Sequence, residues 1–182
     1  MTKERYNNMI TTKNNLTTTT TGPIERKMVM TRLFNASPEL VFKAYIDSNL
    51  IQQWWGPKRL TTAVVKMDVR PGGIWRFVQR ESNGNEYVFN GMYHEIVQSK
   101  RLVYTFEFEG MPGHVTVETV TFEEDHGSKT KLTIESFFQT VEDRDLMLNL
   151  RVGGGAAESM DRLVELLKCL KYKGQYMTMI KC

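Results

Sequence analysis

The clearest alternation of apolar and polar positions along the chain lies at residues 102–109, LVYTFEFE. Apolar side chains recur at every second position, so they fall on one face of a strand, and threonine and glutamate fall mostly on the other. The apolar positions are Leu102, Tyr104, Phe106 and Phe108. This segment therefore predicts a strand with one face against a core.

Six further segments predict strands, because they are rich in β-branched and aromatic residues and are bounded by turn signals. They are residues 24–34, 61–69, 74–81, 86–97, 114–124 and 129–137. The stretches PGG at residues 71–73 and SNGN at residues 82–85 are typical of turns. The strands are therefore expected to follow one another as an antiparallel meander.

Two short helices are expected between the first and second of these strands. Ser37 is a good N-cap, Pro38 fits the first helical position and Glu39 complements the helix dipole. Apolar residues recur at helical spacing as far as Tyr45, and residues 49–54 continue as a second short helix. A Gly-Pro pair then ends it.

The last element is a long amphipathic helix that begins at Thr140, where Asp143 completes a start resembling a capping box. Its middle carries Gly153, Gly154 and Gly155 followed by two alanines. Each interior glycine costs a helix roughly 1 kcal/mol relative to alanine. We interpret this bare stretch as a helix bend over a cavity; a plain break between two helices and a close approach of helix to sheet are the alternatives.

The order of elements indicates the α+β class: a curved antiparallel sheet of six to seven strands, two short helices after the first strand, and a long C-terminal helix across the concave face. Residues 1–22 are rich in threonine and asparagine and are expected to form a flexible arm, which can add to a sheet edge. Residues 23–170 are the predicted domain, and residues 171–182 are a C-terminal tail.

Composition narrows the function. The chain has 182 residues, 24 basic and 21 acidic, with the two signs interspersed, which disfavours nucleic-acid binding. The two cysteines, Cys169 and Cys182, match neither a disulfide framework nor a zinc-binding spacing. No apolar run approaches the ~20 residues of a membrane span, and no signal-peptide region is evident. A cytoplasmic protein without a membrane association is expected.

Four motifs, WWGPKRL, DVRPGGIWRF, GMYHEI and RLVYTF, resemble in order and spacing the activator of heat-shock-protein-ninety ATPase homologue family, within the START-like (SRPBCC) helix-grip superfamily. The resemblance covers about residues 24–168. The matching positions are Trp54, Trp55, Gly56, Pro57, Asp68, Arg70, Gly72, Gly73, Trp75, Arg76, Gly91, Tyr93, Glu95 and Ile96. One position departs: the family usually has Gly-Trp in the last helix, and here Gly155 is followed by Ala156.

The resemblance implies a helix-grip fold with a cavity between the sheet and the last helix. Members of the superfamily bind or process hydrophobic small molecules, and a self-resistance protein for an enediyne antibiotic looks related. Eukaryotic members of the nearer family stimulate a chaperone ATPase by means of an additional N-terminal domain. The threonine-rich arm stands in that place here.

Large side chains and bare backbone near the expected cavity are the candidate ligand-binding residues. They are Trp54, Trp75, Phe77, Tyr93, Tyr104, Phe106, Met147, Leu150 and Gly154. For Trp75 a core position between the short helices and the sheet is favoured over a place at the ligand. Because Trp54 and Trp55 are adjacent, they point apart, so one is expected in the core and the other near the opening.

Polar candidates are fewer. His94, His114 and His126 have no second histidine at ligand spacing, so neither a metal site nor a cofactor is predicted. Strand glutamates at positions 95, 107, 118 and 135 and arginines at positions 32, 70 and 76 are expected to form solvent-facing cross-strand pairs. The alternative is a buried Arg–Glu pair that orients a polar ligand group.

Three functions follow. The first is binding of a hydrophobic or amphipathic small molecule in the cavity, without catalysis. The second is a protein-interaction module of the chaperone-activator type. The third is an enzyme of the cyclase or hydratase kind, which requires a titrating group inside the cavity and falls if His94 and every strand glutamate face solvent. The oligomeric state is open, although the arm can exchange between the subunits of a homodimer.

Overall fold

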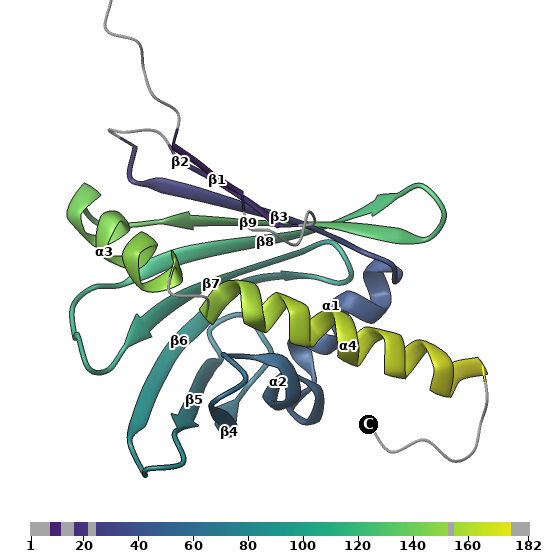
Figure 1. The fold of residues 1–182 in the computed structure, drawn as a ribbon, viewed down its shortest axis with the longest axis horizontal. Coiled ribbons are helices and arrows are strands. Elements are labelled where there is room, and N and C mark those ends of the chain that lie inside the picture. Colours follow the sequence, from purple (N-terminus) through teal and green to yellow (C-terminus); the bar gives the residue numbers. More distant parts are fainter. Residues whose placement is uncertain (1–7, 12–16, 22–24, 153–154, 176–182) are drawn as a thin grey trace, which may run out of the picture.

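The structure is a computed structural model that describes residues 8–11, 17–21, 25–152 and 155–175 (Figure 1). Within these residues one antiparallel sheet has nine strands in the order β1-β2-β3-β9-β8-β7-β6-β5-β4. The strands are β1 (Asn8–Thr11), β2 (Thr17–Thr21), β3 (Lys27–Phe34), β4 (Thr61–Met67), β5 (Ile74–Arg80), β6 (Glu86–Val97), β7 (Arg101–Phe108), β8 (Thr116–Asp125) and β9 (Lys129–Phe137). The helices are α1 (Pro38–Ile46), α2 (Ser48–Trp54), α3 (Val141–Val152) and α4 (Gly155–Gln175).

Strands β3 to β9 form the curved sheet of seven strands that the sequence predicts, and the α+β helix-grip class is confirmed. The helices lie on the concave side of this sheet, and α4 crosses in front of it (Figure 1). Strands β1 and β2 extend the sheet beyond β3, with β2 paired to β3 in the register Thr17↔Arg32. Parts of the arm thus add to the sheet edge, as threonine favours; flexibility of the remaining arm stays a prediction.

Local capping agrees with the predicted helix starts, with one difference. The carbonyl oxygen of Ser37 accepts the first amide bonds of α1, but its side chain makes no capping bond to the helix. Asp47 caps α2 by accepting from the amide of Asn49 at 2.8 Å. At α3 the hydroxyl oxygen of Thr140 accepts from the amide of Asp143 at 3.0 Å, as the capping-box pattern predicts.

The predicted long helix is divided into α3 and α4. Gly153 and Gly154, at which the division falls, lie outside the described residues. Helix α4 is held to the segment after α2 by Arg162, whose guanidinium donates to the carbonyl oxygens of Gly56 at 2.8 Å and Gln53 at 2.7 Å. It is held to the sheet by the ion pair of buried Arg32 with Asp161 at 2.6 Å. These contacts fix the end of α4 nearest the division over the sheet.

Two glycines of the family motifs sit where no side chain fits. A Cβ atom on Gly91 would lie 1.8 Å from the carbonyl oxygen of Thr105, and one on Gly73 would lie 2.0 Å from that of Asp68. Gly73 also pairs with Tyr93, whose amide donates to its carbonyl oxygen at 2.9 Å. Gly91 therefore allows close backbone contact between β6 and β7, and Gly73 allows the turn before β5 to close on itself.

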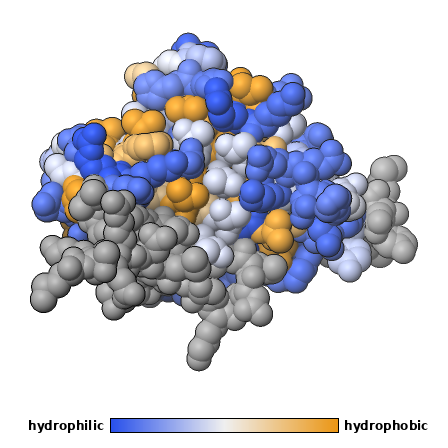
Figure 2. All heavy atoms as spheres, turned by 90° about the horizontal axis from the view of Figure 1, so that it is seen from above, coloured by the Kyte–Doolittle hydropathy of each residue, from blue (hydrophilic) through white to orange (hydrophobic). Residues whose placement is uncertain are grey.

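Surface features complete the fold. Figure 2, seen from above, shows hydrophobic patches interspersed with hydrophilic ones, in keeping with the mixed charge of the chain. Within the described part of the chain, no helix combines the length and apolarity that a membrane crossing demands. Cys169 on α4 is disulfide-bonded, although the cysteine spacing predicts no disulfide framework; Cys182 lies outside the described residues.

Candidate functional site

A pocket of about 440 Å³ lies between the concave face of the sheet and the last two helices. Strands β5 to β8 supply one wall, and the segment that follows α2 supplies another. Helix α3 and the first turn of α4 close the remaining side, through Leu146, Met147, Gly155 and Ala156. The pocket therefore lies beneath the division between α3 and α4.

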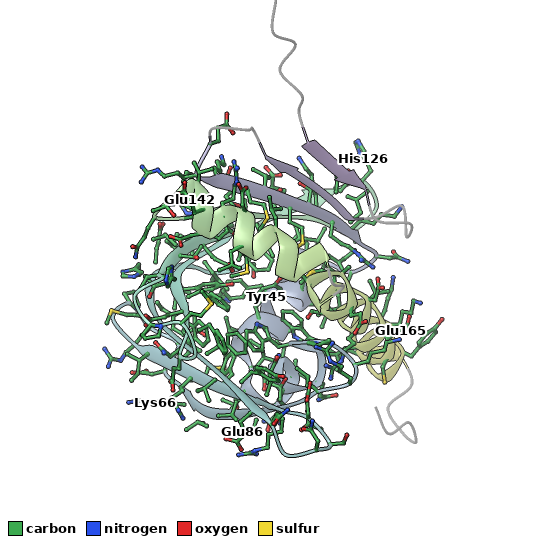
Figure 3. The ribbon with its side chains drawn as sticks, turned by 60° about the vertical axis from the view of Figure 1, so that its left-hand side comes forward. Tyr45, Lys66, Glu86, His126, Glu142 and Glu165 are labelled. Atoms are coloured by element: carbon green, nitrogen blue, oxygen red, sulfur yellow. The ribbon has the colours of Figure 1, made fainter. Side chains whose placement is uncertain are left out.

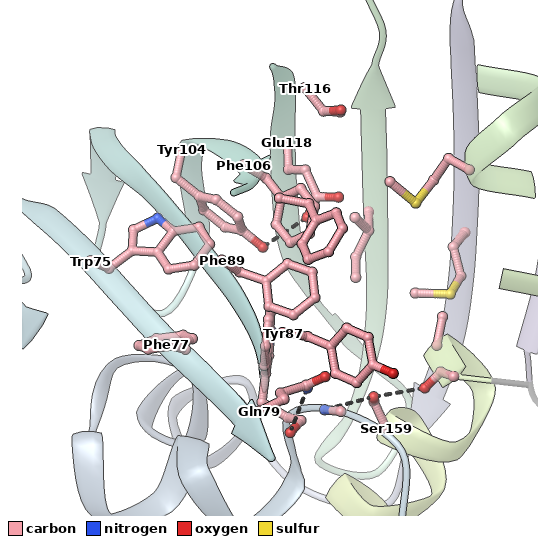
Figure 4. A pocket seen from close by; sticks show the side chains of 18 of the residues that line it. Trp75, Phe77, Gln79, Tyr87, Phe89, Tyr104, Phe106, Thr116, Glu118 and Ser159 are labelled. Atoms are coloured by element: carbon pink, nitrogen blue, oxygen red, sulfur yellow. Dashed lines mark hydrogen bonds between the residues drawn. The ribbon is translucent and has the colours of Figure 1, made fainter. Parts of the chain in front are cut away.

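Aromatic rings make up most of the wall on the sheet side (Figure 4). Trp55 is central to them: its ring lies edge-on to those of Phe77 at 5.2 Å and Phe89 at 5.1 Å between centroids. Trp75 lies 4.9 Å from Phe77 and 6.0 Å from Phe106 in tilted arrangements. Such packing holds each ring in place, so the wall presents a fixed apolar surface.

Seven of the nine predicted site residues line this pocket. They are Trp54, Trp75, Phe77, Tyr93, Tyr104, Phe106 and Met147. Leu150 belongs to α3, but its side chain is outside the described part, and Gly154 is outside the described residues altogether. Ligand binding by any of these residues stays a prediction. Trp55, Phe89 and Glu118 also line the pocket, and the sequence analysis did not include them among the site residues.

The two adjacent tryptophans diverge as predicted. Trp54 is 1% exposed, and its indole nitrogen donates to the carbonyl oxygen of Ala44 at 3.0 Å. Its ring packs on Tyr45 at 4.7 Å, so Trp54 belongs chiefly to the core between α1 and α2. Trp55 is half-buried and faces the aromatic wall. The member of the pair that offers the larger pocket surface is therefore Trp55.

The bare backbone at the start of α4 overlooks open space. A Cβ atom built on Gly155 meets no heavy atom within 4 Å. Ala156, the next residue, is half-buried and also lines the pocket. Small residues at this position thus leave volume unfilled on the helix side.

A polar corner interrupts the apolar wall on β7 and β8, with a serine of β9 behind it. Tyr104 lies opposite Glu118, which lies opposite Ser136 in the strand register. The hydroxyl of Tyr104 donates to one oxygen of Glu118 at 3.0 Å (Figure 4). The hydroxyl of Ser136 donates to the other oxygen at 3.1 Å. Burial, with the nearby Glu118 carboxylate, raises the pKa of Tyr104 well above its usual range, so this phenol stays protonated.

A second polar group lies at the opposite end of the pocket. The hydroxyl oxygen of Ser159 accepts from the amide of Gly56 at 2.9 Å, and the hydroxyl donates to the carbonyl oxygen of Gly155 at 2.8 Å. The buried amide of Gln79 lies close by (Figure 4). These bonds tie the first turn of α4 to the loop after α2.

One side-chain hydrogen bond links α3 to the segment before β8, beside the pocket. The imidazole of His114 lies 2.6 Å from a carboxylate oxygen of Asp143, and both residues line the pocket. Hydrogen bonding to His114 lowers the pKa of Asp143 below its usual value. This contact therefore holds the first turn of α3 beside the pocket.

Of the remaining polar candidates, Arg32 is buried and pairs with Asp161, whereas both other histidines lie at the surface. His94 and His126 are exposed, and Figure 3 places His126 at the periphery and Tyr45 inside the molecule. Arg76 pairs with Glu109 at 2.7 Å and Arg101 with Glu95 at 2.6 Å, both at the surface. Neither pair joins one of the predicted arginines to one of the predicted glutamates. Among the described residues no group of three or more histidine, cysteine, aspartate or glutamate side chains is arranged to hold a metal ion.

Of the groups that the enzyme hypothesis requires, His94 faces solvent, but Glu118 is only 6% exposed and lines the pocket. The third hypothesis therefore stays a prediction.

The curved sheet, the helix across it and the pocket between them define a helix-grip protein. The family described as "Activator of Hsp90 ATPase homolog 1-like protein" matches residues 35–168, and the chain belongs to this family. The resemblance drawn from the sequence motifs is thereby confirmed. No curated protein matches the chain.

Solved structures with the same fold come from several bacteria. A protein from Arthrobacter aurescens is 20% identical to this chain with a TM-score of 0.75, and the match covers 82% of this chain and 90% of the Arthrobacter protein. One from Rhodobacter sphaeroides is 21% identical with a TM-score of 0.74, over 81% of this chain and 97% of its own. One from Nitrosomonas europaea is 23% identical with a TM-score of 0.71, over 82% and 97%. At this identity the likeness establishes the fold alone.

Proposed function

We propose that this protein binds a hydrophobic or amphipathic small molecule in the pocket beneath the division between α3 and α4. The observation that supports the proposal is the pocket of about 440 Å³, lined largely by aromatic side chains. Pockets that bind small organic molecules are typically of this size and combine an apolar wall with a few polar groups. The small residues Gly155 and Ala156 favour the same function, because they leave room on the helix side.

Burial of apolar area supplies the binding free energy in this proposal. A ligand that covers ~300 Å² of apolar wall gains roughly 7 kcal/mol at ~25 cal/mol per Å², before the cost of association. Rings such as Trp55, Trp75 and Phe89 are already packed on one another, so little side-chain entropy is lost when a ligand enters. A rigid wall therefore favours flat molecules.

Native mass spectrometry of the full chain, purified from its source, tests the proposal. We expect a complex heavier than the chain by the mass of a small organic molecule, which is released when the protein is denatured. The bare chain mass, together with no calorimetric binding of naphthalene derivatives at millimolar concentration, would contradict the proposal.

A second function, docking to a chaperone, is favoured by an apolar stripe on the sheet. Ile74 and Met92 are cross-strand partners and are 43% and 39% exposed; Val117 and Phe137 are partners and are 39% and 45% exposed. Thr105 joins the two pairs, since its hydroxyl oxygen accepts from the amide of Met92 and it lies opposite Val117. Exposed apolar groups aligned across four strands are typical of protein-interaction surfaces.

The stripe is tested by the ATPase turnover of the Hsp90 chaperone from the same source, with and without this protein. The docking function predicts a faster turnover that a Phe137→Glu variant loses, whereas a Glu123→Lys variant on the exposed end of β8 retains it. No binding and no change in turnover would remove this function.

A further inference from the structure

One tyrosine of the pocket differs from two others in what its hydroxyl group contacts. The hydroxyl of Tyr104 donates to Glu118 at 3.0 Å (Figure 4). That of Tyr87 donates to Glu81 at 3.3 Å. Tyr93 also lines the pocket and is only 4% exposed, but its hydroxyl has no hydrogen-bond partner within the part of the chain that the structure describes. Because a buried polar group without a partner is costly, a ligand that supplies the partner gains affinity.

The chemistry of a buried phenol favours donation by Tyr93. Burial raises the pKa of Tyr93 above its usual value, so the phenol keeps its proton. A phenol has one proton to donate and an oxygen that also accepts. Its oxygen lone pair is partly delocalised into the ring, so it is a better donor than acceptor. A ligand oxygen that accepts this proton therefore completes the hydrogen bonding of Tyr93, which a hydrocarbon does not.

Backbone and ring contacts hold Tyr93 in position before any ligand arrives. Its amide donates to the carbonyl oxygen of Gly73 at 2.9 Å, and its carbonyl oxygen accepts from the amide of Gly72 at 2.7 Å. Its ring lies 6.1 Å from that of Tyr104, its cross-strand partner on β7, at an angle of 71°. A hydroxyl on a ring that is already packed loses little side-chain entropy when it binds.

Resting on the proposed function, we propose that the pocket binds flat aromatic molecules that carry a ketone or ether oxygen, and that the hydroxyl of Tyr93 donates to this oxygen. The apolar body of such a molecule lies against the aromatic wall, which continues from Phe106 through Trp75 and Tyr104 to Tyr93. Tyr93 acts as a specificity-determining residue, because its hydroxyl adds affinity only for ligands that offer an acceptor.

Calorimetric titration of the full chain with two naphthalene compounds of the same shape tests this role. β-Acetonaphthone carries a ketone oxygen where β-isopropenylnaphthalene carries a methylene group. Tyr93→Phe removes only the hydroxyl, so it should weaken binding of the ketone about tenfold and leave that of the hydrocarbon within about twofold. Tyr87→Phe makes the same change at a pocket tyrosine whose proton goes to Glu81, and should alter the ketone-to-hydrocarbon ratio by less than about twofold.

Two further measurements distinguish this role from a purely structural one. Tyr93→Phe should leave the midpoint of urea unfolding of the ligand-free chain unchanged or raise it, because the protein loses no hydrogen bond. A clear fall of the midpoint would show that the hydroxyl has a partner in the protein and would overturn the inference. The carbonyl stretching band of bound β-acetonaphthone should lie at a lower frequency in the wild-type complex than in cyclohexane, since donation to the oxygen weakens the C=O bond. This second measurement needs no variant, so it decides the matter if Tyr93→Phe does not fold.

The outcomes separate the two proposals. An equal effect of Tyr93→Phe on both compounds, or a carbonyl band that stays at its cyclohexane frequency, would overturn the role of Tyr93 and leave the pocket as a binding site. Failure of both compounds to bind the wild-type chain would remove the proposed function, and this inference with it.

Discussion

Filling the pocket from the helix side is the sharpest perturbation that the structure offers. Ala156 lies on the first turn of α4 and lines the pocket, and its neighbour Gly155 has no heavy atom within 4 Å of a built Cβ position. A tryptophan at position 156 would direct its indole into the pocket that Ala156 lines. The family usually has a tryptophan after the glycine here, so the change is compatible with the fold.

The apolar area that the new side chain buries sets the size of the changes in stability and in ligand affinity. A tryptophan side chain buries ~150–250 Å², so covering about half of it gains roughly 2–3 kcal/mol at ~25 cal/mol per Å². Helix propensity and rotamer ordering cost about 1 kcal/mol of this. The free energy of unfolding should therefore rise by about 1–2 kcal/mol. A ligand that loses about 150 Å² of wall contact loses roughly 4 kcal/mol, which weakens its binding several hundredfold.

Urea unfolding and calorimetric titration with β-naphthyl methyl ether measure the two effects on the same samples. Ala157→Trp is the matched control, because Ala157 is half-buried on the same turn and does not line the pocket. It should leave the affinity for the ether within about threefold of the wild-type value. A folded Ala156→Trp protein with unchanged affinity would refute the assignment of the pocket as the binding site.

Three further predictions address the fold around the pocket. Trp54→Phe should lower the free energy of unfolding by about 2–3 kcal/mol in urea, since it leaves a void and removes the bond to Ala44; a loss below about 0.5 kcal/mol would contradict its core role. Gly91→Ala should lower the free energy of unfolding by about 3 kcal/mol or more, because the added Cβ atom meets the carbonyl oxygen of Thr105. Gly155→Ala should leave this free energy unchanged or raise it by up to about 1 kcal/mol. Equal effects of the two variants in urea unfolding would show that the contact with Thr105 does not limit stability. Because His114 lowers the pKa of Asp143, the carboxylate contributes stability that is present above its unfolded pKa and is lost as the pH falls through the lowered folded value. Asp143→Asn should therefore flatten the acid side of the melting-temperature profile below about pH 4, and an unaltered profile would exclude this contribution.

Local sequence patterns were sufficient to predict most of the strands and helices of the fold. Strands β6 and β9 begin and end where the alternation and turn residues predict, because turns such as SNGN fix both boundaries. The start of α3 is likewise confirmed, since the bond from the Asp143 amide to Thr140 is a contact within one helical turn. Strand addition by residues 17–21 was left open, because pairing with β3 depends on a partner strand that periodicity alone does not identify.

The site was harder to predict than the fold. The apolar face of β7 was readable from its alternation, and Tyr104 and Phe106 do line the pocket. Glu118 was not, because its position inside the pocket follows from the registers of β7, β8 and β9, which are set by contacts between distant residues. Trp55 was passed over for Trp54, since adjacency indicates that the two diverge and does not indicate which faces inward.

The account rests on a guest molecule between the aromatic wall and the first turn of α4. A crystal structure of the full chain soaked with β-naphthol tests this most directly. We predict electron density for the naphthalene ring inside the pocket, against Trp55 and Phe89. Density for the compound only elsewhere on the surface, or a pocket occupied by the protein's own side chains, would contradict it.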